Sequence, residues 1–131
     1  MLRRPLASPV DAAAIGLTVK LETPQTRNEP WRLITSIDSH DLAVEQQGKK
    51  WVGLLQIVYS VQTETGKELA GVLDTVNLDL KTEVWREIAA KGLSLRKEFS
   101  PPPEASKVRI AVLDLSTDRM GSISVPLRRA E

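Results

Sequence analysis

The only histidine of the chain, His40, follows Ser39 directly and lies close to two aspartates, Asp38 and Asp41. Serine, histidine and aspartate are the residue types of a hydrolase triad, in which the histidine takes the proton of the serine hydroxyl. Triads are assembled in space from separate segments, whereas neighbouring side chains in a tight turn point in different directions. Residues 38–41 therefore predict a turn, and we expect no catalytic residue among them.

Oxygen ligands for a hard cation could come from Asp38, Asp41 and Asp118, because calcium takes roughly six to eight of them. The spacing of these residues does not match a calcium-binding loop, whose ligands alternate along one short segment. Aspartate is also a preferred turn residue, since its side chain accepts hydrogen bonds from nearby backbone amides. We expect turns at these positions and no metal site.

Two carboxylates that face one cleft would suit glycoside hydrolysis. Glu64, Glu68 and Asp74 come closest to such a set, but they flank a predicted hairpin turn at Gly66, which is a solvated setting. The chain has no cysteine and no glycine-rich phosphate loop, which argues against thiol nucleophiles, thiolate metal sites and bound nucleotides. We therefore predict no enzymatic activity and no cofactor. A hydrolase with an unrecognised site is a weaker alternative, and it would need His40 in a pocket beside a nucleophile.

The three tryptophans, Trp31, Trp51 and Trp85, are the remaining candidates for ligand or partner contacts. Flat indole rings exposed on a β-sandwich would suit a carbohydrate-binding module, because they stack on sugar faces. Trp51 shares a predicted strand face with Leu55, however, and Trp31 shares one with Leu33. Because aromatic side chains dominate core burial, the pattern favours core or helix-packing positions for all three.

Charge and hydropathy exclude several classes of protein. Eighteen basic and seventeen acidic residues leave a net charge of +1, so there is no clustered positive charge for nucleic acid. No apolar stretch is long enough to span a membrane. The first ten residues include two arginines and two prolines but no long apolar run, so we expect no signal peptide in this chain.

Alternation of apolar and polar residues with period two is the dominant pattern, and it predicts strands. The longest covers about residues 50–63. We expect its start to lie in the centre of a sheet and its end to be more exposed to solvent. Asp74 interrupts the apolar face of the next strand, which indicates a position near a sheet edge. The other strands are expected near residues 17–21, 31–37, 42–44, 93–99, 108–113 and 122–127, with turns at 46–49, 64–67 and 116–121.

The period changes between residues 82 and 91, where the sequence predicts one short helix. Val84 and Ile88 are four residues apart, as are Trp85 and Ala89, so that the four form one apolar stripe. Gly92 follows directly and is typical of a helix C-terminus.

Many short strands with regular turn signals and one helix predict an all-β fold, an immunoglobulin-like antiparallel β-sandwich of about seven to nine strands. We expect a flexible segment at residues 1–14 and a single domain over residues 15–131. If the domain adds a strand to a partner, the sheet edges near Asp74 or near Pro126 are the expected places.

Short matches spread over nearly the whole chain carry a family resemblance. They are LASP at 6–9 leading into GLTV at 16–19, IDSHDL at 37–42 leading into KWVG at 50–53, TGK at 65–67, LDL at 78–80 and KGL at 91–93. The most extensive are VRIAVLD at 108–114 and GSISVPL at 121–127. With these motifs the chain resembles the C-terminal, immunoglobulin-like domain of the "VWFA-related" proteins of Acidobacteria and relatives, in which a signal sequence and a von Willebrand factor type A-like domain come first.

The resemblance implies a non-enzymatic accessory domain of an exported protein, acting as a spacer or as a docking module for the adjacent type A-like domain or another protein. It implies an extracytoplasmic location and no catalytic residues. The Asp-x-Ser-x-Ser metal motif of type A domains is not in this chain, and the nearest string, at 114–118, has the wrong order. A carbohydrate-binding module, which would need exposed tryptophans, is the alternative function. The oligomeric state and the partner stay open.

Overall fold

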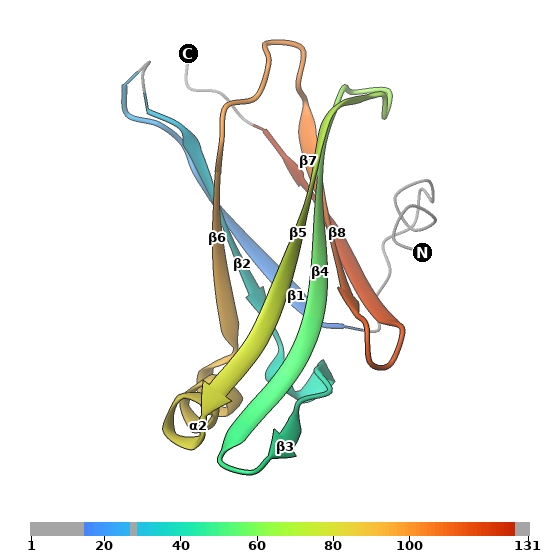
Figure 1. The fold of residues 1–131 in the computed structure, drawn as a ribbon. Helices are drawn as coiled ribbons and strands as arrows, with labels where there is room; N and C mark the ends of the chain where they lie inside the picture. Colours follow the sequence, from blue (N-terminus) through green and yellow to red (C-terminus); the bar gives the residue numbers. More distant parts are fainter. Residues whose placement is uncertain (1–14, 27–28, 128–131) are drawn as a thin grey trace.

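The computed structural model describes residues 15–26 and 29–127, which form eight strands, one α-helix and one 3₁₀ turn (Figure 1). The expected flexible segment, residues 1–14, lies outside the described residues. The elements in chain order are β1 (Leu17–Glu22), β2 (Trp31–Ile37), η1 (Ser39–Asp41), β3 (Glu45–Gln47), β4 (Lys50–Gln62), β5 (Glu68–Lys81), α2 (Thr82–Lys91), β6 (Leu93–Phe99), β7 (Lys107–Asp114) and β8 (Arg119–Pro126).

The strands form two antiparallel sheets. One has the order β1-β2-β6. The other is built around β4, which pairs with β5 along its whole length, with β3 over its first residues and with β7 over its second half, and β8 pairs with β7. β1, β6, β5 and β8 each pair with one neighbour only, so they are sheet edges. The all-β sandwich expected from the alternation is confirmed.

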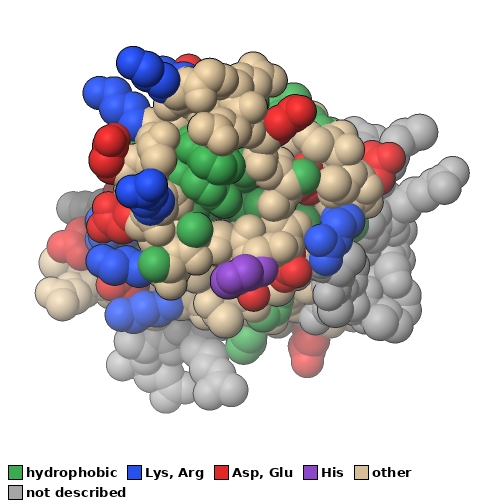
Figure 2. All heavy atoms as spheres, turned by 90° about the horizontal axis from the view of Figure 1, so that it is seen from below, with side chains coloured by type: hydrophobic (Ala, Val, Ile, Leu, Met, Phe, Trp, Pro, Cys, Tyr) green, Lys and Arg blue, Asp and Glu red, His purple; other side chains and the backbone are tan. Residues whose placement is uncertain are grey.

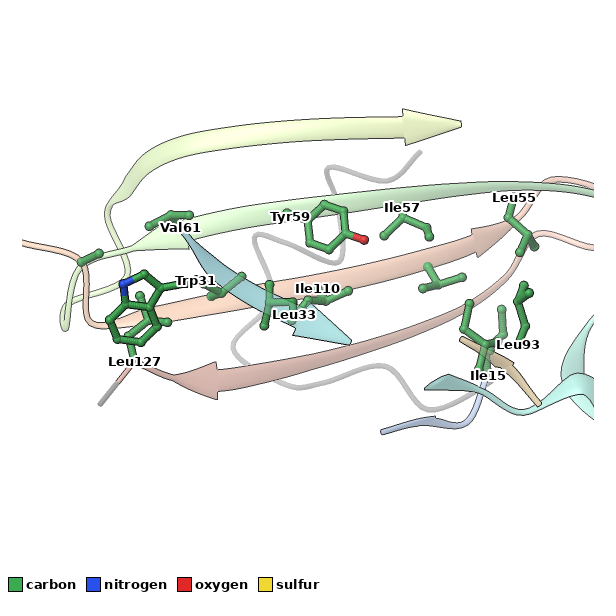
Figure 3. Packing of buried hydrophobic residues seen from close by; sticks show 14 of the residues in the cluster. Ile15, Trp31, Leu33, Leu55, Ile57, Tyr59, Val61, Leu93, Ile110 and Leu127 are labelled. Carbon is green, nitrogen blue, oxygen red and sulfur yellow. The ribbon is translucent and has the colours of Figure 1, made fainter. Parts of the chain in front are cut away.

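The core lies between the two sheets, because each strand turns every second side chain toward the other sheet. Leu33 of β2 meets Ile57 of β4 and Ile110 of β7 in one cluster (Figure 3). The alternate residue of β7, Ala111, faces away from this core and packs in a second, smaller cluster with Val58. Burial on both faces makes β7 the most enclosed strand of the described structure.

The start of the described chain closes one side of the sandwich. The amide of Ile15 donates to the carbonyl of Met120 at 3.2 Å, and the amide of Gly16 donates to the Asp41 carboxylate at 2.8 Å. Gly121 of β8 makes this crossing possible, since a Cβ there would collide with the carbonyl oxygen of Ile15. β1 and β8 are thereby held together, while the opposite side of the sandwich lies between β5 and β6.

The predicted helix is confirmed as α2, and it packs across one end of the sandwich (Figure 1). Trp85, Ile88 and Ala89 are half-buried, as the stripe predicts. Val84 does not join them, because it lies outward with 43% of its surface exposed. Gly92 ends the helix with a φ of +88°. Among the described residues no helix has the length and apolar character needed to cross a membrane.

The short strand expected at residues 42–44 is wrong. Residues 39–41 form a 3₁₀ turn in which Asp38 accepts a hydrogen bond from the amide of His40. The amide of Ala43 donates to the carboxylate of Asp114 and not to a backbone carbonyl of a neighbouring strand. Pairing with β4 begins only at Glu45, in β3, a polar strand that the sequence pattern assigned to a turn.

Two further expectations are corrected by strand pairing. β4 is exposed at its start and buried at its end, the reverse of the expected order. On the side away from β5, the long strand β7 pairs with residues 55–62, whereas residues 50–52 pair only with the short strand β3. The last turn is shorter than expected, since β8 already begins at Arg119 and Asp118 takes a φ of +58°.

Candidate functional site

Trp31 lies in the core near one end of the sandwich (Figure 3). The alternation of β2 points it inward together with Leu33, and 7% of its surface is exposed. Its ring meets that of Phe99 on β6 with centroids 6.4 Å apart and planes tilted by 49°. In this position Trp31 fixes the pairing of β2 and β6 and has little surface left for a ligand.

Trp51 and Trp85 form a stacked pair that joins β4 to α2. Their ring centroids are 5.9 Å apart with planes inclined by 23°, and the indole nitrogen of Trp51 donates to the hydroxyl of Thr82 at 3.3 Å. Each ring therefore uses one face to hold the helix against the sheet. Both side chains are only half-buried, so part of their surface is accessible at this end of the molecule.

His40 lies on the surface of the same end, where it is the purple side chain in Figure 2. Its side chain is 85% exposed, and Nδ1 is 3.1 Å from Oδ1 of Asp38. Hydrogen bonds from the backbone amide and then from the side chain of His40 lower the pKa of Asp38. Ser39 points elsewhere, since its hydroxyl donates to the carbonyl of Ala89 at 3.1 Å. The three residues line a shallow groove beside the end of α2, but they do not form a nucleophile–base pair.

The candidate carboxylates for metal or acid–base chemistry are dispersed. Asp41 accepts hydrogen bonds from the amide of Gly16 and from Arg119, and Asp118 lies in the turn before β8. Glu68 accepts a hydrogen bond from the Ser60 hydroxyl at 2.8 Å. Across residues 15–26 and 29–127, no three histidine or acidic side chains gather as a metal site would require.

A pocket of about 100 Å³ opens on the side of the sandwich between the edge strands β5 and β6, and we call it the lateral pocket. Ala70 and Val72 of β5 line one side and Phe99 of β6 lines the other. Its remaining lining is mainly apolar and comes from the core and from the segment after β6: Leu33, Tyr59, Val61, Lys97, Ser100, Pro101, Pro102 and Val108.

An ion pair crosses between the two sheets beside this pocket. Nζ of Lys97, on β6, lies 3.0 Å from Oδ2 of Asp74 on β5 and 5.7 Å from the centroid of the Tyr59 ring. Burial, and after it the negative charge of Asp74, raises the pKa of Tyr59 to about 12. The phenol therefore stays neutral at physiological pH, and the one cation here is matched by the Asp74 carboxylate.

The first half of β5 exposes apolar surface next to the lateral pocket. Residues 70–73 are all exposed, with Val72 at 42% and Leu73 at 57%. These two and Val84 are the exposed large hydrophobic side chains of the described residues. One feature of the sequence pointed to this edge, the charge of Asp74 on an otherwise apolar strand face, but its partner Lys97 lies on β6 in the other sheet.

Comparison of the chain with protein-family models, with curated proteins and with solved structures found no match. The geometry of the molecule is therefore the basis for the proposals that follow.

Proposed function

We propose that the chain is a non-enzymatic protein-interaction domain that contacts its partner through the first half of β5. The observation that carries this proposal is the exposed apolar surface of Val72 at an apolar pocket, on an edge strand whose opposite face exposes Leu73. Exposed apolar surface that continues into a pocket marks an interaction site, whereas single exposed apolar residues do not. Fold alone does not define a function, so the surface and not the sandwich is the argument.

The strand order supports an immunoglobulin-like class for this domain. In that fold the first, second, fourth and fifth main strands share one sheet, and the third, sixth and seventh share the other. With β3 set aside as a short addition and β5 added beside the third main strand, as in variable-type domains, β1-β2-β6 correspond to the first, second and fifth strands and β4-β7-β8 to the other set. The fourth main strand has no counterpart among the described residues. Together with the motifs at 108–114 and 121–127, this favours an accessory domain of an exported von Willebrand factor type A-like protein.

Calorimetric titration of this chain with any type A-like domain that its gene encodes upstream tests the docking proposal, and a gene without such a domain would contradict it. We expect saturable binding and a higher unfolding temperature of the mixture, because a ligand that binds only the folded state stabilises it. Absence of both would exclude docking to that domain. Cell fractionation with an antibody to this chain tests the extracytoplasmic location, which a cytoplasmic signal would contradict.

A carbohydrate-binding module is the second candidate, and the half-buried pair of Trp51 and Trp85 is the observation that favours it. In that case a glycan array gives reproducible binding that Trp85→Ala weakens. Trp31→Phe is the matched control, because Trp31 is an indole in the core with 7% exposure. An array without signal, or one whose signal survives Trp85→Ala, removes this candidate.

A further inference from the structure

The free edge of β5 has less protection than the other sheet edges. Its register against β4 shifts once, between Val61 and Gln62, where Leu69 has no paired residue, and residues 70–73 continue as a regular edge. Between Glu68 and Asp74 the strand reads Leu-Ala-Gly-Val-Leu, with no charged residue and no proline. Exposed edges of this kind pair readily with another strand, and proteins normally block them with lysine, proline, bulges or short length. Residues 70–73, beyond this irregularity, form a stretch of edge where strand pairing can be used.

The other edges in the described part of the chain carry such blocks. β6 has three consecutive charged residues, 96–98, and β8 ends at Pro126. β1 carries Lys20 and is held beside β8, and β3 has three residues only. The contrast assigns strand addition to β5 rather than to the edge near Pro126.

The lateral pocket adds a specificity element directly beside this edge. Its volume of about 100 Å³ is well below the roughly 300–1,000 Å³ of small-molecule pockets, and it suits a single aliphatic side chain. Ala70 and Val72 line it from β5, so a strand paired with this edge would direct alternate side chains toward the pocket. Strand-addition sites combine backbone hydrogen bonds for affinity with such pockets for specificity.

We infer that the edge of β5 from Glu68 to Asp74 binds an extended peptide of a partner protein, which pairs with the strand and inserts one aliphatic side chain into the lateral pocket. The inference deepens the proposed function, on which it rests, by naming the chemistry of the partner. That partner segment is a β-strand with an aliphatic anchor, an uncharged centre and a basic residue at the end beside Glu68.

The charges along β5 select this occupant over a second copy of the chain. Glu68, Asp74 and Asp79 lie on the strand, which has no basic residue before Lys81. Asp74 and Asp79 are already paired, with Lys97 at 3.0 Å and with Lys50 at 3.6 Å, so Glu68 is the carboxylate that a basic residue of a partner would meet. A two-fold antiparallel pairing of residues 69–73 with themselves would place Glu68 of one copy near Asp74 of the other. Like charges facing each other destabilise a strand pair, whereas a basic residue of a peptide opposite Glu68 would be attracted.

Selection from a display library of random linear peptides on the full chain tests the inference. We expect enriched peptides with an aliphatic residue at one fixed position and lysine or arginine at the end that lies beside Glu68. Val72→Lys should weaken their binding by at least about tenfold, or about 1.4 kcal/mol, because it places a charge at the mouth of the pocket. Val84→Lys is the matched control, since Val84 has the same side chain and nearly the same exposure but lies on α2.

Enriched peptides that bind Val72→Lys and the wild type equally would overturn the inference, as would a selection without enrichment. A concentration-dependent dimer in ultracentrifugation that Val72→Lys abolishes would also overturn it and would assign the edge to a second copy. Titration of the type A-like domain with Val72→Lys separates the two proposals. Undiminished binding to that domain would leave the proposed docking intact while placing it on another surface.

Discussion

Asp114 shows how one buried carboxylate can hold two segments together. Its side chain is fully buried at the end of β7, where Oδ2 accepts the amide of Ala43 at 2.7 Å and Oδ1 accepts the amide of Ser116 at 2.9 Å. The first bond anchors the segment between η1 and β3, and the second shapes the turn before β8. Asp114 is also the first residue of the segment 114–118, which comes nearest to the metal motif of type A domains. Its two hydrogen bonds to backbone amides give it a structural role instead.

Replacing Asp114 with asparagine should lower the free energy of unfolding by about 1–3 kcal/mol. An amide group in the same place turns one acceptor into a donor, so a buried backbone amide loses its partner. Urea unfolding measures the loss. Asp79→Asn is the control, because the Asp79 side chain is 65% exposed and its oxygen lies 3.6 Å from Lys50, an arrangement worth about 0.5 kcal/mol. Equal effects of the two substitutions would contradict the structural role of Asp114.

Tyr59 should make the stability of the domain fall at high pH. Burial raises its pKa to about 12 in the folded protein, whereas a tyrosine in an unfolded chain has a pKa of about 10. Between these pH values the folded protein keeps a proton that the unfolded chain releases, so the free energy of unfolding decreases as the pH rises. The whole decrease is about 2–3 kcal/mol.

The chain has one tyrosine, so phenolate absorbance reports Tyr59 alone. We expect its titration midpoint near 12 in the folded protein and near about 10 in denaturant. Tyr59→Phe should remove this part of the pH dependence of unfolding. A midpoint near 10 in the folded protein would show that the phenol is in contact with solvent.

At the scale of elements, the junction between α2 and β6 depends on the backbone of Gly92. Its φ of +88° and ψ of 168° fall in a region that is essentially restricted to glycine, and a Cβ would lie 3.1 Å from the carbonyl oxygen of Ile37. Gly92→Ala should therefore cost about 1–3 kcal/mol of stability in a chemical denaturation experiment.

Gly48→Ala is the comparison for that substitution. Gly48 has a φ of +62° in the turn before β4, and no atom lies within 4 Å of a Cβ built there. Gly48→Ala should lower the free energy of unfolding only by the cost of placing alanine in the left-handed conformation, about 1 kcal/mol. A larger loss at Gly48 than at Gly92 would show that contact with Ile37 does not contribute.

Elements that follow their own periodicity could be predicted from the sequence, and elements that depend on a neighbour could not. The helix from Thr82 to Lys91 and the strand from Trp31 to Ile37 have apolar residues at regular spacing and match the expected ranges. β3 consists of Glu45, Gln46 and Gln47, which have no strand pattern, and it is a strand because β4 pairs with it. The exposure along β4 was mispredicted for the same reason, since β7 decides which half is covered.

At the scale of the whole molecule, the side chains around the lateral pocket could not be predicted from the sequence. Tyr59, Asp74 and Lys97 come from three strands and from both sheets, and their contacts exist only after the sheets have packed. The sequence did indicate that the strand with Asp74 lies near an edge, which the pairing of β5 confirms. It did not indicate which strand of the opposite sheet would supply the cation.

Because one core joins both sheets, the domain should unfold as a single unit, and Ile110 is the residue to test. Its side chain is completely buried on β7 in the cluster that includes Leu33 of the facing sheet. Ile110→Ala should lower the free energy of unfolding by about 2–5 kcal/mol, the cost of removing buried methyl groups and leaving a cavity. Ile34→Ala is the matched control, because Ile34 is the outward residue of β2 and is only half-buried. Its loss should be about 1 kcal/mol or less.

In both variants, circular dichroism and tryptophan fluorescence should report the same midpoint. Trp31 lies between the sheets, while Trp51 and Trp85 join α2 to β4, so the fluorescence covers the core and the helix end together. Coincident transitions are the mark of two-state unfolding. If Ile110→Ala separated the two signals, the helix end would be a unit of its own. The strand β5, which runs from the proposed docking edge at the lateral pocket to the start of α2, would then join two units.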